Sequence, residues 1–128
     1  TGEYTNYFGL AATRAAYEQG EPWLEALLEV IRGNYDYCKN FMAEKFPSVT
    51  VYPLEGTYLL WADFNSLGLE PAELERFMVE HQLYLDEGYL FGTGGAGFER
   101  INLACPRQCL TAAMERLDAA AAEFGFKR

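Results

Sequence analysis

The chain has 128 residues, of which 50% are apolar and 16% aromatic, and its formal net charge at pH 7 is −9. This length and composition predict one domain with a hydrophobic core and exclude a disordered chain. The acidic charge argues against nucleic acid and membranes as partners because nothing offsets phosphate repulsion, and no apolar run approaches the roughly 20 residues of a membrane span. The cysteines show no CxxC spacing, which indicates neither a disulfide framework nor a zinc site, so a reduced, cytoplasmic setting is expected.

Two helices are predicted in the first third of the chain. Over residues 5–18, small and apolar side chains recur at three- and four-residue spacing, and Gly20 stands where a helix cap is expected. Residues 21–46 carry the strongest periodic signal, which Pro47 ends, and their apolar stripe is interrupted only at Gly33-Asn34. The stripe consists of Trp23, Leu24, Leu27, Leu28, Ile31, Tyr35, Cys38, Phe41 and Met42. At ~1.5 Å per residue, a helix of about 24 residues measures roughly 36 Å, a length typical of an element that braces two domains.

The start of the chain is unusually aromatic and lacks an initiator methionine. Tyr4, Tyr7, Phe8 and Leu10 lie close together in the sequence, and we expect them to form an exposed apolar patch. The opening Thr1 leads directly into this helical segment, which favours a segment of a longer protein.

Four strands are predicted in the middle of the chain. Residues 49–52 and 57–64 are joined by a hairpin-like connection at 53–56, and both alternating faces of the second run are largely apolar. We therefore expect this second strand to be central and covered on both faces. Residues 83–86 and 100–104 are the two further strand candidates.

Two more helices complete the predicted fold, at residues 71–82 and 108–124, with Gly125 as the cap of the second. Their expected inward residues are Leu74, Phe77, Met78 and His81 in the first, and Leu110, Ala113, Met114, Leu117, Ala121 and Phe124 in the second. The order of elements predicts an α/β fold (an α+β sandwich) in which helices pack on a small, mostly antiparallel sheet of about four strands.

The glycine-rich segment contains a nominal dinucleotide motif. Gly92-Thr-Gly94-Gly-Ala-Gly97 reads G-x-G-x-x-G, but the dinucleotide site needs a strand before the glycines and a helix opening from them. Here the glycines lead into a strand-like run instead, and no Lys-Ser/Thr follows as in a phosphate-binding P-loop. Neither nucleotide site is therefore predicted.

Arg100 is the strongest candidate for a binding residue. A guanidinium fork beside a glycine-rich loop suits a small carboxylate or phosphate. The simpler interpretation is an exposed strand arginine paired with a glutamate such as Glu99, and the residues alone favour it. Asn102 on the same strand face adds a second polar group, which favours a site.

The other reactive side chains predict no chemistry of their own. His81 is the only histidine and fits a core or rim position, since it makes neither a metal site nor a Ser-His pair. Cys105 and Cys109 are interpreted as packing near a helix start, where Pro106 and Arg107 begin the helix. The lysines are Lys39, Lys45 and Lys127, and none stands in a pattern typical of a buried, activated amine.

Three segments resemble a known family. Residues 55–61 (Glu-Gly-Thr-Tyr-Leu-Leu-Trp), 89–92 (Tyr-Leu-Phe-Gly) and 97–107 (Gly-Phe-Glu-Arg-Ile-Asn-Leu-Ala-Cys-Pro-Arg) look like the C-terminal part of class I/II pyridoxal-phosphate (PLP) enzymes. The branch they resemble most is that of the cystathionine β-lyase-like (MalY/PatB) aminotransferases. The similarity extends over essentially the whole chain and is specific in the combined order of its segments.

The resemblance implies a domain division and a binding site. Residues 1–20 would end the large domain, 21–46 would form the connecting helix, and 47–128 would be the C-terminal small domain. Arg100 would bind the α-carboxylate of an amino-acid substrate, with Asn102 as its polar neighbour. The parent would use PLP, contact this segment through its own large domain and form a homodimer. The implied loop over the active-site entrance contains Gly88, Tyr89, Phe91, Gly92 and Gly97.

The departures from the family limit what the chain is expected to do alone. The Schiff-base lysine belongs to a Ser-x-x-Lys segment upstream, so no catalytic residue, bound PLP or metal is expected here, and the fragment should be inactive by itself. Glu87-Gly88 replaces an expected Pro-Gly before the loop. Aminotransferase and C–S lyase both stay open for the parent, and a free-standing α/β module that binds small carboxylates or mediates assembly is the alternative.

Overall fold

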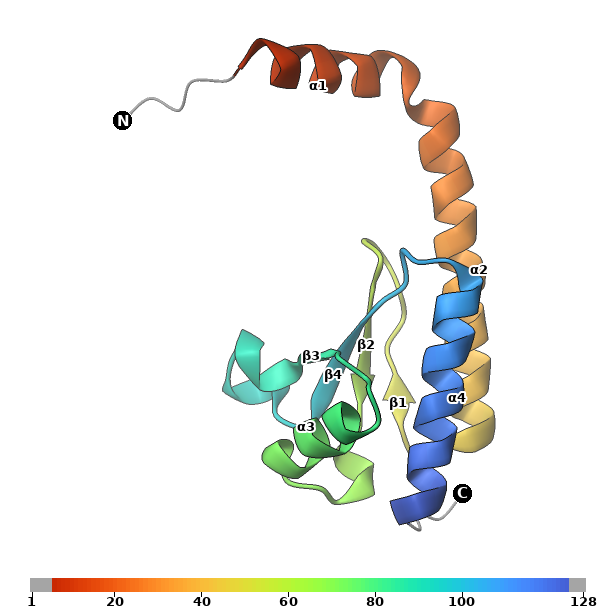
Figure 1. Cartoon of the computed structure of the whole chain (residues 1–128), viewed down its shortest axis with the longest axis vertical. Helices are drawn as coiled ribbons and strands as arrows, with labels where there is room; N and C mark the ends of the chain where they lie inside the picture. Colours follow the sequence, from red (N-terminus) through yellow and green to blue (C-terminus); the bar gives the residue numbers. More distant parts are fainter. Residues whose placement is uncertain (1–5, 125–128) are drawn as a thin grey trace. The chain divides into compact units, whose positions relative to one another are not determined.

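The computed structural model of the chain describes residues 6–124 (Figure 1). Its helices and strands are α1 (Tyr7–Gln19), α2 (Glu21–Lys45), β1 (Thr50–Val51), β2 (Leu59–Asp63), α3 (Pro71–Glu80), β3 (Asp86–Glu87), β4 (Phe98–Asn102) and α4 (Arg107–Phe124). Short 3₁₀ turns, η1 (Asn65–Leu67), η2 (Gly88–Phe91) and η3 (Thr93–Gly95), lie between them. The chain divides into two compact units, Thr1–Val30 and Ile31–Arg128.

The first unit contains α1 and the first turns of α2, and both of these helices were predicted. The Asn6 side chain caps α1 by accepting a hydrogen bond from the Gly9 N–H at 2.7 Å. Gly20 ends α1 with φ −85°, and its N–H donates to Ala16 O. A Cβ at Gly20 would collide with that same oxygen, so the close approach at the joint of the two helices requires glycine.

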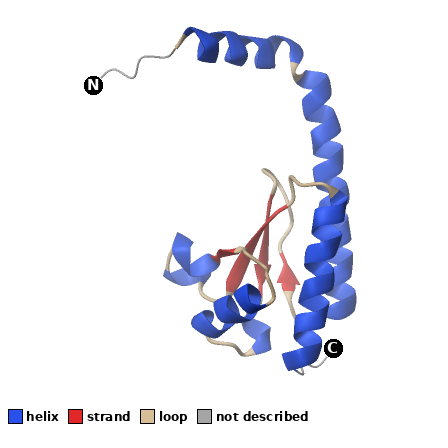
Figure 2. Cartoon of the chain, viewed as in Figure 1, coloured by secondary structure: helices blue, strands red, loops and turns tan. Residues whose placement is uncertain are grey.

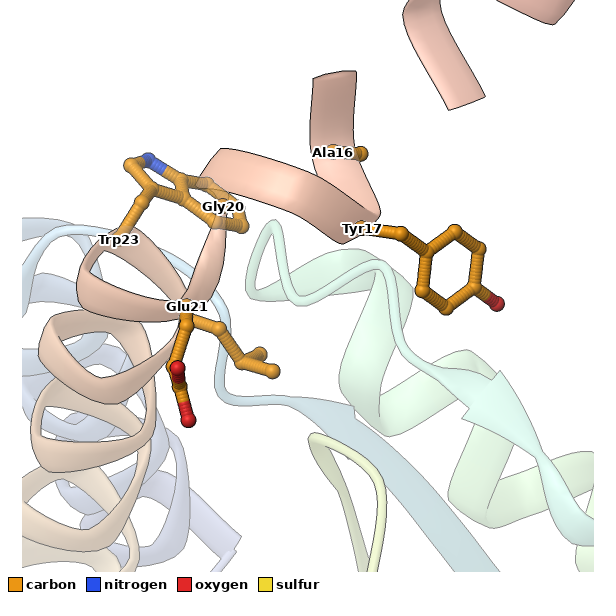
Figure 3. Close-up of a pocket in the computed structure, with 6 residues that line it drawn as sticks. Ala16, Tyr17, Gly20, Glu21 and Trp23 are labelled. Carbon is orange, nitrogen blue, oxygen red and sulfur yellow. The ribbon is translucent and has the colours of Figure 1, made fainter. Parts of the chain in front are cut away.

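Several large apolar side chains in the described part of the first unit are exposed. No residue of α1 is buried, and the exposed fractions of Tyr7 and Phe8 are 90% and 86%. The predicted exposure is therefore confirmed for Tyr7, Phe8 and Leu10, their grouping into one patch stays a prediction, and Tyr4 lies outside the described residues. Figure 3 shows a pocket at the α1–α2 joint. Its lining consists of Ala16, Tyr17, Gly20, Glu21, Trp23 and Leu24.

The second unit is built on a four-stranded antiparallel sheet in the order β1-β2-β4-β3. The hairpin of β1 and β2 and the central place of β2 are confirmed. Leu60, Ala62 and Phe64 are buried on one face of β2, but Leu59 and Trp61 on the other are only half-buried. The expected cover on both faces is thus partial.

All four strands differ in their bounds from the prediction: β1 and β2 are shorter than residues 49–52 and 57–64, and the third and fourth strands are shifted. Residues 83–85 form no strand, and the third strand is the two-residue β3, although Leu83 is buried in the connection before it. The fourth strand begins at Phe98, because the segment pairs with β2 from Asp63 onward. Pairing with a neighbouring strand, which short-range alternation does not reveal, decides the bounds of the third and fourth strands.

The core lies between the sheet and the helices of the second unit. Figure 2 shows α4 alongside the second half of α2, and the ion pair between Lys45 Nζ and Asp118 Oδ2 at 3.6 Å joins the same two helices. All the expected inward residues of α3 and α4 are buried or half-buried where they are described; the Phe124 side chain and Gly125 lie outside the described residues. Helix α3 ends at Glu80, so His81 caps it at the rim instead of extending its inner stripe.

The apolar stripe of α2 differs from the prediction at its start and at Asn34 in its middle. Trp23 and Leu24 are exposed, and burial begins at Ile31. Asn34, which was predicted to interrupt the stripe, is 1% exposed and belongs to the core. No helix within residues 6–124 is long and apolar enough to cross a membrane.

Candidate functional site

Arg100 lies at the centre of β4 with a partner on each side. Across the sheet it stands opposite Trp61 of β2 and opposite Asp86 of β3. Ile101 and Leu103 are buried on the other face, as the alternation predicted. The Arg100 side chain is 29% exposed, so the strand presents a partly desolvated cation on the less covered face of the sheet.

Asp86 holds one edge of the Arg100 guanidinium. Its Oδ2 accepts hydrogen bonds from Nη2 at 2.7 Å and from Nε at 3.1 Å. The prediction that a glutamate such as Glu99 pairs with Arg100 is wrong, because adjacent strand residues point to opposite faces and Glu99 is buried. The ion pair forms instead across the sheet, with the residue in register on β3.

One aromatic ring covers the Arg100 guanidinium, and two further rings extend from that ring. The Arg100 Cζ lies 4.4 Å from the centroid of the Phe91 ring, a cation–π geometry. Phe91 meets Trp61 edge-on with ring centroids 5.8 Å apart, and Trp61 stacks on Phe98 at 5.5 Å. The four side chains form a contiguous column, which we call the aromatic column (Arg100, Phe91, Trp61 and Phe98).

The loop over residues 88–97 is folded into the two 3₁₀ turns η2 and η3. The Gly97 carbonyl accepts from the Phe64 N–H at 2.9 Å, and the Ala96 carbonyl accepts from the Asn65 side chain at 3.1 Å. Gly97 has φ +79°, where a Cβ would also meet the Asn65 side chain. The role of this loop as a lid over the active-site entrance stays a prediction. The contacts above anchor the loop at the end of β2.

The other loop residues of the predicted site divide between contact and exposure. Tyr89 donates from its hydroxyl to Glu75 Oε2 at 2.9 Å, which ties the loop to α3. Gly88 is buried, whereas Gly92 is exposed with φ +127°. Of the predicted loop residues named here, Phe91 is the one whose side chain contacts Arg100.

We expect Gly95→Ala to destabilise this loop. The two glycines Gly88 and Gly95 approach so closely that a Cβ on Gly95 would collide with the Gly88 carbonyl, which is backbone and cannot swing away. The expected loss in free energy of unfolding is about 1–3 kcal/mol, measured by urea denaturation. Gly94→Ala is the matched control because its Cβ would meet nothing within 4 Å. Equal stability of the two variants would contradict the prediction.

Asn102 lies beside Arg100 but is engaged locally. Its Oδ1 accepts from the Ala104 N–H at 2.8 Å, so it shapes the turn that follows β4. Both residues line one pocket with Asp86, Tyr84 and Cys105. The structure therefore brings Arg100 and Asn102 together, as predicted, and adds Asp86.

Sequence reasoning missed Asn34, which connects α2 to the end of β4. Its Nδ2 donates to Leu103 O at 2.8 Å and to Cys105 O at 2.9 Å, and its Oδ1 accepts from Arg107 Nε at 2.8 Å. The Arg107 guanidinium also lies 4.7 Å from the Tyr37 ring centroid. An amide within an apolar helical stripe was the available signal, since buried polar groups need partners.

Glu99 is the second residue that the sequence did not reveal. It is 1% exposed on the core face of β4, and its Oε2 has no hydrogen-bond partner among the described residues. Burial, followed by the charges of Glu87, Glu75 and Asp86, raises the pKa of this carboxyl to about 8. Glu99 is therefore largely protonated at neutral pH and is available to donate a proton to a hydrogen bond.

Two of the cysteines and the histidine have raised pKa values. Burial raises the pKa of the Cys38 thiol to about 12 and also raises that of Cys105, so both resist forming thiolates. His81 Nδ1 contacts the Phe77 carbonyl at 2.7 Å, which raises the pKa of the imidazole. Within the described residues, no group of three His, Cys, Asp or Glu side chains could hold a metal ion.

The sequence and the fold of the chain were compared with known proteins. No family model matches the chain. It is 35% identical to cystathionine β-lyase PatB of Bacillus subtilis over 90% of its length, and 36% identical to the protein MalY of Escherichia coli over 79%. These matches cover 30% and 26% of the two relatives, so the chain spans about a third or less of their length.

Solved structures agree in fold and sequence. Cystalysin of Treponema denticola, which contains PLP, superimposes with a TM-score of 0.93 at 37% identity, over 96% of this chain and 32% of its own. A PLP-bound protein of Clostridium difficile 630 that is named as an aminotransferase gives 0.89 at 45% identity, over 93% and 31%. In sequence and in fold, the chain belongs to the cystathionine β-lyase-like (MalY/PatB) branch of the PLP-dependent aminotransferases and corresponds to their C-terminal domain.

Proposed function

We propose that the chain contributes the substrate-carboxylate site of a PLP-dependent aminotransferase or cystathionine β-lyase-like C–S lyase that acts on amino acids. The observation that carries this proposal is the held guanidinium of Arg100. Asp86 accepts hydrogen bonds along the Nε–Nη2 edge of the guanidinium. The Nη1–Nη2 edge therefore offers two parallel N–H donors that match the geometry of a carboxylate. Asn102 lines the same pocket as a second polar group.

Arg100 would orient the substrate by binding the α-carboxylate on two atoms at once. A two-point contact fixes the direction of the bond from the carboxylate to Cα, and therefore the position of the Cα proton that the reaction removes. Both transamination and C–S elimination begin with an amino acid held in this way. The proposal therefore covers both reactions with the same role for Arg100.

The described residues do not fit PLP itself. Its covalent anchor is a lysine amine, and Lys45 is engaged with Asp118 at 3.6 Å while Lys39 lies 5.8 Å from the Tyr35 ring centroid, both on α2. When bound in the whole protein, PLP supplies an electron sink for the amino-acid carbanion. We assign PLP binding to the large domain, of which residues 1–20 would be the end. Residues 21–46 would form the connecting helix, and residues 47–128 would form the small domain. The whole protein would be a cytoplasmic homodimer.

Replacement of Arg100 tests the proposal in the full-length protein that carries this chain. Arg100→Ala is expected to raise the KM for the amino-acid substrate about 100-fold, the worth of two charge-assisted hydrogen bonds. Arg100→Lys should recover only part of this, because an ammonium keeps the charge without the fork. Steady-state kinetics with the amino-acid substrates and with their decarboxylated amines measures the effect. The KM for the amines should not change, because they lack the carboxylate that Arg100 binds.

Arg76→Ala is the matched control, since its side chain is 64% exposed in a weak pair with Glu80 on α3. An unchanged KM in Arg100→Ala would contradict the proposal. So would an upstream coding sequence without a lysine-bearing large domain, which would favour the free-standing carboxylate-binding module instead.

A further inference from the structure

We propose that Asp86 and Phe91 are positioning residues that fix the Arg100 guanidinium with its Nη1–Nη2 edge free for a carboxylate. This inference rests on the proposed function and adds two residues to it. Neither side chain need touch the substrate, because each acts through Arg100. They come from two different elements, the edge strand β3 and the 3₁₀ turn η2, which follow one another in the chain.

Asp86 determines which edge of the guanidinium is used. A single oxygen, Oδ2, accepts from both Nε and Nη2, at 3.1 and 2.7 Å. These two N–H groups lie on the same side of the planar group, so their capture prevents rotation within the plane. The antiparallel register places Asp86 opposite Arg100, so the sheet itself sets the position of the carboxylate.

Phe91 determines the orientation of the guanidinium plane. Its ring centroid lies 4.4 Å from Cζ of Arg100, which covers one face of the cation and excludes water from it. The ring is in turn supported by Trp61, edge-on at 5.8 Å, and Trp61 by Phe98 at 5.5 Å. The aromatic column thus connects the guanidinium, through Phe91 and Trp61, to the central strand β2.

The charge of Asp86 makes the positioning role distinguishable from simple neutralisation. As an anion beside Arg100, Asp86 lowers the attraction of the site for a second anion. If it served only to neutralise, Asp86→Ala and Asp86→Asn would both improve carboxylate binding. If it positions Arg100, Asp86→Asn keeps an acceptor for Nε and Nη2 and preserves binding, whereas Asp86→Ala frees the guanidinium and weakens it.

The first measurement is independent of activity. In ¹⁵N-labelled chain, NMR follows the exchange of the Arg100 Hε proton with water, which the hydrogen bond to Asp86 should slow. We expect Asp86→Ala to speed this exchange about 10-fold or more, and Asp86→Asn to leave it within about 3-fold. The ring-current shift of the same proton should disappear in Phe91→Leu and return in Phe91→Tyr. Unchanged exchange and shift in these variants would overturn the inference.

The second measurement is the kinetic effect in the full-length protein. We expect Asp86→Ala and Phe91→Leu to raise the KM about 10-fold with kcat within about 3-fold, and Asp86→Asn and Phe91→Tyr to restore it. Asp36→Ala on the exposed side of α2 and Val79→Ala on α3 are the matched controls, since both residues are exposed. Circular dichroism checks that each variant is folded.

The outcomes separate this inference from the proposed function. If Arg100→Ala raises the KM but Asp86→Ala and Phe91→Leu do not, the positioning role is overturned while the function of Arg100 stands. If Asp86→Ala and Asp86→Asn both lower the KM, Asp86 is a neutralising charge and the inference is again overturned. If Arg100→Ala itself has no effect, the proposed function fails and the positioning role fails with it.

Discussion

Replacing Glu99 by glutamine is expected to raise the free energy of unfolding at pH 8–9 and to flatten its dependence on pH. In the native chain the Glu99 carboxyl is buried on the core face of β4, and its pKa is raised from 4.5 to about 8. Burial is the main cause, and the charges of Glu87, Glu75 and Asp86 add to it. Glutamine has nearly the same shape and cannot ionise.

The sign of the effect follows from proton linkage. Between pH 4.5 and about 8 the folded state keeps the Glu99 proton that the unfolded state has already released. The folded state then binds more protons, so the free energy of unfolding falls as the pH rises through this window, by at most about 1.4 kcal/mol per pH unit. The total loss is on the order of 3–5 kcal/mol, and it is complete above the folded-state pKa.

Urea denaturation at several pH values from 5 to 9 measures this effect. The curves of the native chain and of Glu99→Gln should diverge as the pH rises, with the variant more stable at the alkaline end. Glu115→Gln is the matched control because Glu115 is exposed on α4. Parallel curves for the native chain and Glu99→Gln would mean that the Glu99 carboxyl is not held in its neutral form.

The elements of the fold were predictable where the pattern is local. Pro71 at the start of α3, the alternation that buries Ile101 in β4 and Leu103 just after it, and the hairpin of β1 and β2 are each determined by residues close in the sequence. The two-residue strand β3 was misplaced because it exists only through pairing with β4. Its two residues carry no apolar alternation of their own.

The site was predictable in its central residue but not in its supports. Arg100 and Asn102 could be singled out as polar groups on one strand face, and the structure places both in one pocket. Asp86 could not be paired with Arg100, because that contact joins residues 14 apart through the sheet register. Long-range pairing is therefore the physical reason that the partner expected from the sequence, Glu99, was wrong.

The contacts of Asn34 with the segment after β4 and with Arg107 could not be predicted from the local sequence pattern. Replacing Asn34 has the second large expected effect. We expect Asn34→Ala to lower the free energy of unfolding by about 2–4 kcal/mol, since it leaves two buried or half-buried carbonyls and the Arg107 Nε without their partner. The carbonyls belong to Leu103 and Cys105, just after β4. Urea denaturation at pH 7 measures the loss.

Asn34→Asp separates the two functions of the amide. A carboxylate still accepts from Arg107, and more strongly, but it cannot donate to the carbonyls of Leu103 and Cys105. We therefore expect Asn34→Asp to be destabilised as well, because the donated hydrogen bonds matter most to the folded state. Asn40→Ala, at an exposed position of the same helix, is the matched control. If Asn34→Asp were as stable as the native chain, the pairing with Arg107 alone would hold α4 against α2, and the donated bonds would be dispensable.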